Sequence, residues 1–123
     1  MKPEHWKDEP EPQDYPAAES YLSLLMDPAD AAKLASALQA TDKLDHYKAK
    51  DVLRASGLPL LDEDNKHVAS DLAKVRAGKK LSPVLLVRGR PLQVADGYHR
   101  VCASYHIDEN ADIPCRIVDP SGP

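Results

Sequence analysis

The chain has no phenylalanine and few aromatic residues of any kind, so aliphatic side chains must form most of its core. Aromatic residues make up 5% of the 123 residues, with one tryptophan and five tyrosines. Hydrophobic residues together reach 42%, which is enough for one compact domain of this length. Long apolar runs are also missing, so the sequence offers no membrane span. We expect one domain whose core is built from leucine, valine, isoleucine and alanine.

Positive charge and cysteine are scarce as well. Sixteen lysines and arginines stand against twenty aspartates and glutamates, which gives a net charge of −4. This balance argues against a general affinity for nucleic acids or anionic membranes, although it leaves room for a local basic pocket. Cys102 and Cys115 fall in a predicted helix and a predicted strand, and the first residues form no apolar leader. We therefore expect free thiols and a cytoplasmic protein.

The first forty-odd residues divide into two segments of different composition. Prolines and charged residues dominate residues 1–16, which predicts a flexible acidic tail because little apolar area is available for burial. Trp6 and Tyr15 are its only sizeable apolar groups and are able to dock on the domain. Residues 17–43 show helical periodicity, and we interpret them as two packed helices, with a partner-binding hairpin as the alternative. The predicted helices are Ala17–Met26, whose apolar side holds Tyr21, Leu22, Leu24 and Leu25, and Pro28–Gln39.

Short strands and helices alternate over residues 44–118, and residues 119–123 form a second tail. The strand Val84–Val87 is a continuous apolar run, which indicates burial on both faces. Asp64 or Asn65 is suited to cap the predicted helix that begins at Lys66. The other predicted strands are 44–48, 92–95 and 113–118, and the predicted helices are 50–54, 66–77 and 97–105.

The segment from Leu92 to Ala103 contains the most informative pattern in the chain. It reads as a strand, a glycine turn and a helix whose first turn carries His99 and Arg100. Unpaired N–H groups and the positive end of the helix dipole make such a turn an anion site. Gly97 permits close approach of the backbone, and Arg100 can hold a phosphate through paired donors. We therefore predict a phosphate ligand, that of a nucleotide.

Four stretches in this order resemble the ParB/sulfiredoxin superfamily over residues 44–118, including its Gly-x-His-Arg signature. The resemblance implies an α+β fold with a small mixed sheet and packed helices, here preceded by the two N-terminal helices. It also implies binding of ATP or another nucleotide, with Mg²⁺ carried by that nucleotide. The stretches are Val52–Leu61, His67–Val75 with Leu81–Val87, Ala95–Arg100 followed by Ala103, and Ile113–Val118.

The resemblance also implies site residues in two places. Arg100 would neutralise phosphate charge, His99 would donate a hydrogen bond or shuttle a proton, and Asp96 would cap the turn or help to hold Mg²⁺. Tyr98 would stack on a base or close the rim, unless it only packs. The residues expected to contact the nucleotide are Gly97, Tyr98, His99 and Arg100 at the turn, and His67, Ser70 and Lys74 on the preceding helix.

Departures from the family pattern limit the chemistry that we expect. Tyr98 occupies the position of the sulfiredoxin catalytic cysteine, and Cys102 reads as a core residue, so sulfinic-acid reduction is not expected. The turn Asp96–Arg100 is closer to the branch that phosphorylates free serine, which also needs a carboxylate near the substrate hydroxyl. The acidic loop offers Asp62, Glu63 and Asp64 for that role, although such a cluster also suits a solvated turn.

Two functions from different classes stay open at this point. The first is a nucleotide-binding domain that catalyses phosphoryl transfer or slow nucleotide hydrolysis, with His99, Asp96 and Glu63 as candidate catalytic residues. The second is a non-catalytic regulatory or protein-interaction module that keeps the fold without using a nucleotide, with a small-molecule or protein partner. No helix-turn-helix follows Val118, so we do not expect sequence-specific DNA binding. No protein-held metal site is expected either.

Overall fold

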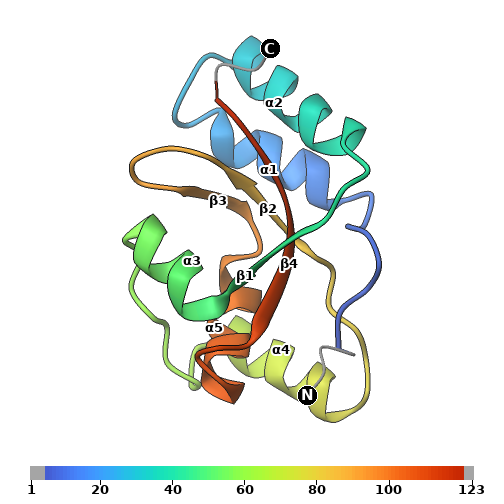
Figure 1. The fold of residues 1–123 in the computed structure, drawn as a ribbon, viewed down its shortest axis with the longest axis vertical. Helices are drawn as coiled ribbons and strands as arrows, with labels where there is room; N and C mark the ends of the chain where they lie inside the picture. Colours follow the sequence, from blue (N-terminus) through green and yellow to red (C-terminus); the bar gives the residue numbers. More distant parts are fainter. Residues whose placement is uncertain (1–4, 121–123) are drawn as a thin grey trace.

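The computed structural model describes residues 5–120 and shows an α+β protein with a four-stranded mixed sheet (Figure 1). The α+β class expected from the sequence is therefore confirmed. The strands are β1 (Asp45–Lys48), β2 (Val84–Val87), β3 (Gln93–Asp96) and β4 (Asp112–Val118). The helices of the described range are α1 (Asp14–Leu22), α2 (Pro28–Ala40), α3 (Ala49–Ser56), α4 (Lys66–Arg76) and α5 (Tyr98–Ile107).

The sheet has the strand order β1-β4-β2-β3. The central strands β2 and β4 run parallel, and the outer strands β1 and β3 pair antiparallel with them. A parallel pair needs a long crossover connection, and here β3 and α5 lie between β2 and β4 in the chain. This connection brings the N-terminus of α5 to the end of β3.

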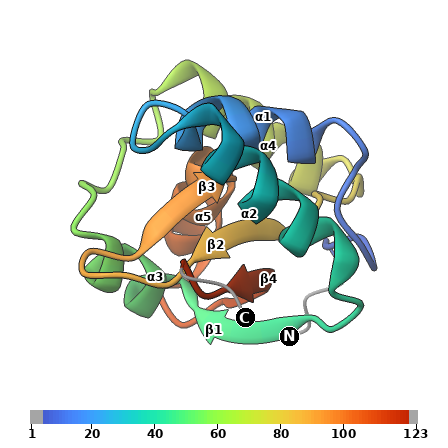
Figure 2. The ribbon, with the colours of Figure 1, turned by 90° about the horizontal axis from the view of Figure 1, so that it is seen from above.

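Strand β2 is buried on both faces, as its apolar run predicts. Side chains alternate across a strand, so Val84 and Leu86 join the core cluster beneath α3, α4 and α5, whereas Leu85 and Val87 join the cluster beneath α1 and α2. Figure 1 shows the sheet between these two groups of helices, and Figure 2 views it from the side of α1 and α2. The two N-terminal helices therefore form one layer of the fold.

The first helix lies earlier in the chain than its periodicity predicts. Helix α1 begins at Asp14 rather than Ala17 and ends at Leu22 rather than Met26. A carboxylate at Asp14 favours the positive end of the helix dipole, and its Oδ2 accepts a hydrogen bond from the Glu11 N–H at 3.0 Å. Leu24 and Leu25 then fall in a turn and are 81% and 50% exposed, so their predicted place in the core is wrong.

The prediction of a flexible tail over residues 1–16 is not what the structure shows for residues 5–16. Trp6 and Tyr15 are both buried. The backbone of Leu81 donates to the His5 carbonyl at 2.6 Å and accepts from the Lys7 N–H at 2.7 Å. One large aromatic group and an isolated β-bridge to Leu81 thus hold a segment of low average hydrophobicity. Residues 1–4 and 121–123 of the predicted tails lie outside the described residues.

The remaining predicted elements agree with the structure to within a few residues, and Asn65 is the cap of α4, accepting from the N–H groups of His67 and Val68. Both cysteines are free and buried, as expected. Burial raises the pKa of the Cys102 thiol, which therefore stays protonated at neutral pH. None of the described helices has the length and apolar character needed to cross a membrane.

Candidate functional site

The two segments singled out by the sequence line one cavity of about 450 Å³. One segment is a face of α4, and the other is the turn between β3 and α5. The segments are more than twenty residues apart in the chain, and the sheet brings them together. The predicted site residues that line the cavity are His67, Ser70, Lys74, Asp96, Gly97, His99 and Arg100.

Gly97 is required here by its conformation and by its close neighbours. Its φ of 111° lies in a region that side chains disfavour. A Cβ atom added at Gly97 would come within 2.4 Å of Val84 Cγ1, so the glycine lets the turn lie against β2. Helix α5 begins directly after it, and no side chain caps this helix N-terminus. Its first-turn N–H groups have no partners within the helix, which suits an anion.

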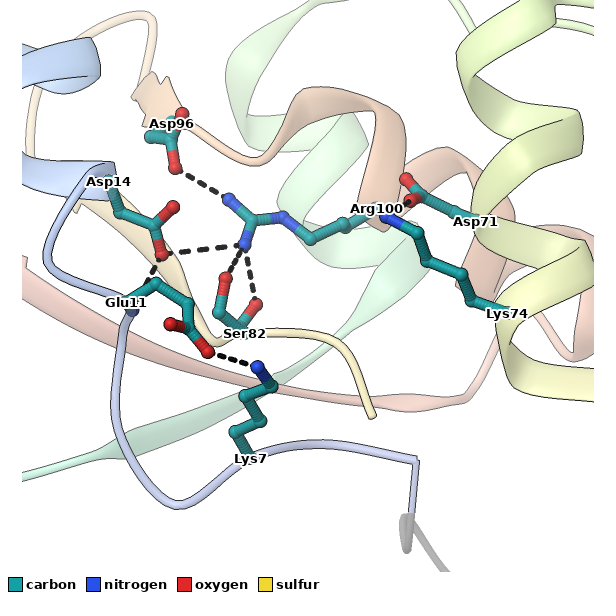
Figure 3. Close-up of polar contacts among 8 residues, drawn as sticks. All are labelled: Lys7, Glu11, Asp14, Asp71, Lys74, Ser82, Asp96 and Arg100. Carbon is teal, nitrogen blue, oxygen red and sulfur yellow. Dashed lines mark hydrogen bonds and ion pairs between the residues drawn. The ribbon is translucent and has the colours of Figure 1, made fainter. Parts of the chain in front are cut away.

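Arg100 extends from the first turn of α5 into a ring of oxygen atoms (Figure 3). Its NH2 donates to Asp96 Oδ2 at 2.6 Å, and its NH1 donates to the Ser82 carbonyl at 2.8 Å and to the Ser82 hydroxyl. NH1 also lies 3.6 Å from Asp14 Oδ2. The guanidinium is thus held by groups from β3, from Ser82 two residues before β2, and from the start of α1.

Two carboxylates share this one guanidinium. The pKa of Asp96 is raised to about 6, because burial raises it more than the nearby Arg100 guanidinium lowers it, and the Asp14 carboxylate adds to the rise. The side chains of Asp14 and Asp96 are only 10% and 20% exposed, so water screens their repulsion weakly. Their combined charge exceeds that of Arg100, which leaves this corner of the cavity negative when both carboxyl groups are ionised.

Two histidines also line the cavity. The rings of His67 and His99 are 4.7 Å apart and tilted by 48°. Burial lowers the pKa of His99, and His67 lowers it further, while Asp71 opposes this shift. His99 is therefore neutral at pH 7 and can donate through one ring nitrogen and accept through the other. Such a ring is suited to contact a phosphate oxygen or to move a proton.

Positive and negative groups are balanced along the cavity wall. Burial raises the pKa of Asp71, and the ammonium of Lys74 opposes this shift from 3.9 Å. Lys7 pairs with Glu11, whereas Lys80 makes no ion pair with any described residue. The formal charges are carried by Lys7, Lys74, Lys80 and Arg100 against Glu11, Asp14, Asp71 and Asp96.

Two predicted site residues do not reach the cavity. Glu63 is 58% exposed and faces His106 at 3.6 Å, so the structure does not bring this candidate catalytic carboxylate to the site. The Tyr98 hydroxyl donates to the Pro59 carbonyl at 2.5 Å, and the ring packs against the core cluster under α3, α4 and α5. Tyr98 therefore packs, which is the alternative that its sequence position left open.

Several lining residues were missed by the sequence analysis. Asp71 lies four residues after His67, so its place on the polar face of α4 follows from helical spacing and was open to prediction. Lys7, Glu11 and Asp14 belong to the segment interpreted as a flexible tail, and no local pattern marks them. Among the described residues, no three of His, Cys, Asp or Glu are grouped as a metal site would require.

Comparisons with protein-family models, with curated proteins and with solved structures found no match to this chain.

Proposed function

We propose that this cavity binds a nucleotide through its phosphates, with the turn at Gly97 as the phosphate site. Lys74 and Lys80 would neutralise phosphate charge, and His99 would hydrogen-bond a phosphate oxygen. The first-turn N–H groups of α5 add a site of fixed geometry for an anion. The best reaction class for such a site is phosphoryl transfer or slow nucleotide hydrolysis.

One observation carries this proposal. The residues of α4, expected from the family resemblance, and those of the α5 turn are more than twenty positions apart in the chain, and they line the same polar cavity. Its volume of about 450 Å³ falls within the range of ligand-binding pockets. Lys80 adds a cation that has no ion-pair partner among the described residues. We also propose that the domain belongs to the ParB/sulfiredoxin type, on the strength of the motif and the order of its elements.

Mg²⁺ would enter with the nucleotide, because protein-bound Mg²⁺ is usually held by one or two carboxylates together with phosphate oxygens. Asp71 fits this requirement: it lines the cavity, and its ion pair with Lys74 is long, at 3.9 Å. Asp96 fits less well because Arg100 already donates to it at 2.6 Å. Asp71 is also the carboxylate we assign to accept a proton from a substrate hydroxyl, in place of Glu63.

The test is thermal unfolding with ATP, CTP or ADP in the presence of Mg²⁺. A ligand at about 100 times its Kd adds about 2.7 kcal/mol to the free energy of unfolding. Lys74→Ala should weaken binding by about 1.5 kcal/mol, or about tenfold, because it removes a charge-assisted donor. Arg76→Ala is the matched control: Arg76 is in the same last turn of α4 but does not line the cavity.

The outcome separates the two functions that the sequence left open. A melting shift that Lys74→Ala and His99→Ala reduce, and Arg76→Ala does not, supports the phosphate site. If no nucleotide shifts the melting temperature of the parent chain or of any variant, the nucleotide proposal is wrong. The protein is then better described as a regulatory or interaction module that keeps the fold.

A further inference from the structure

Residues 5–14 form a segment of bends and turns along one side of the cavity, and we call this segment the strap. Its anchor is Trp6, which is 6% exposed and bridges to Leu81 just before β2. Two backbone hydrogen bonds to Leu81, of 2.6 and 2.7 Å, fix this end of the strap. At its other end, Asp14 is the first residue of α1.

The strap supplies one wall of the cavity (Figure 3). Within the strap, Lys7 pairs with Glu11, and the Glu11 N–H donates to Asp14 Oδ2 at 3.0 Å. These contacts hold the Asp14 carboxylate in the cavity. The strap residues that line the cavity are Lys7, Glu11, Gln13 and Asp14.

Asp14 is the weakest of the groups around Arg100. Its Oδ2 lies 3.6 Å from NH1, whereas Asp96 lies 2.6 Å from NH2 and the Ser82 carbonyl 2.8 Å from NH1. Asp96 is the last residue of β3 and Ser82 lies two residues before β2, whereas Asp14 is at the end of the strap. Asp14 is therefore the partner of Arg100 that can be exchanged with the least disturbance to the fold.

A phosphate and the Asp14 carboxylate compete for the same charge. Both are anions that accept from a guanidinium, and a phosphate offers more oxygens and more charge. A phosphate bound beside an ionised Asp14 would face a like charge in a poorly solvated corner. Binding to Arg100 is thus favourable only when the Asp14 carboxylate leaves.

We propose that Asp14 is an internal competitor for the phosphate position at Arg100, and that a bound phosphate displaces Asp14 and releases the strap from the cavity. This inference depends on the proposed function, since it concerns the regulation of the same site. The strap thereby weakens the apparent affinity for the ligand, and any change that draws residues 5–14 out of the cavity would strengthen binding.

Trp6 is the only tryptophan of the chain, so its fluorescence reports on the strap alone. The ligands to use are the nucleotide with the largest melting shift, with Mg²⁺, and inorganic triphosphate, which tests the phosphate without a base. At saturation, acrylamide quenching of Trp6 should rise because the buried indole becomes accessible. Asp14→Asn keeps the hydrogen bond from Glu11 but removes the charge, and should bind about tenfold more tightly.

Asp8→Asn is the matched control, because Asp8 is an exposed residue of the same strap and does not line the cavity. It should bind like the parent. If ligand binds the parent but Asp14→Asn binds no more tightly, the competition is wrong. If quenching of Trp6 is unchanged at saturation, the release of the strap is wrong, and this measurement needs no variant. Absence of binding in both the parent and Asp14→Asn would instead overturn the nucleotide proposal itself.

Discussion

The regions around Arg100 and Arg116 hold the same helix by different means. Arg100 faces Asp14, the first residue of α1, and Arg116 donates to the hydroxyl of Tyr15, the second residue, at 2.8 Å. Arg100 lies in a cavity between two carboxylates. Arg116 is 8% exposed, and its other acceptors are the carbonyls of Leu38 and Gln39 at 3.3 and 3.2 Å.

The difference shows which of the two arginines is suited to meet a ligand. The acceptors of Arg116 are all neutral, and two of them are carbonyls at the end of α2, where the helix dipole already favours a cation. No described carboxylate lies within ion-pair distance of Arg116, and Arg116 does not line the cavity of the candidate site. Arg100 has acceptors that an incoming anion can replace. Arg116 therefore has a structural role, whereas under the proposed function Arg100 would serve both folding and binding.

The largest expected effect comes from Arg100→Met. It leaves Asp14 and Asp96 close together without their shared cation, which should cost about 3–5 kcal/mol of unfolding free energy at pH 7. Urea unfolding measures this loss. The loss should shrink at pH 5, where a proton can replace the missing cation. A loss below about 1 kcal/mol at pH 7 would mean that the two carboxylates do not depend on Arg100.

The pH dependence of stability tests the carboxylate pair directly. The pKa of Asp96 is about 6 in the folded chain and 3.8 in the reference state, so the folded state holds this proton more tightly. The stabilisation from protonated Asp96 is therefore complete below about pH 4 and is lost as pH rises through 6. Asp96→Asn removes this dependence, and its stability relative to the parent should rise by about 2–3 kcal/mol between pH 4 and 7. Equal pH profiles for the two proteins would refute the raised pKa of Asp96.

These two regions also show how far the sequence alone predicts the site. Gly97, His99 and Arg100 form a local motif with a known physical meaning, so they were predictable. Asp71 was within reach because it shares a helix face with His67. Asp14 was not, because its contact with Arg100 spans more than eighty residues and its segment has the composition of a disordered tail. One buried tryptophan reverses that assignment, and average composition does not register a single residue.

The elements of the fold divide in the same way, into those that local patterns predict and those that depend on contacts between distant residues. Strand β2 and helix α2 were predicted because their patterns are continuous and their ends carry clear signals. The start of α1 was missed, since it depends on the turn between Glu11 and Asp14. The pairing of β4 with β2 joins residues some thirty positions apart, and no local pattern specifies such a register.

A smaller effect is expected from Arg116→Met. It leaves two helix-end carbonyls and one hydroxyl without this donor, but no buried charge, so the cost should be about 1–2 kcal/mol. Arg88→Met is a suitable control because Arg88 is half exposed and its one ion pair within residues 5–120 is with the exposed Asp119 at 3.0 Å. If Arg116→Met is as damaging as Arg100→Met, the distinction between the two arginines fails.

The smallest effect is expected at the hydroxyl that joins Arg116 to α1. Tyr15→Phe removes one acceptor from a cation that keeps its two carbonyls, so the unfolding free energy should fall by about 1 kcal/mol. Tyr21→Phe is the matched control, because its hydroxyl donates to Gln93 Oε1 at 2.9 Å and does not contact Arg116. A double-mutant cycle of Tyr15→Phe with Arg116→Met should give a coupling of about 1 kcal/mol, and the cycle with Tyr21→Phe none. A coupling of zero for Tyr15 would mean that packing alone holds α1 to Arg116. Among the described residues, Asp14 would then be the one polar group that joins the start of α1 to an arginine.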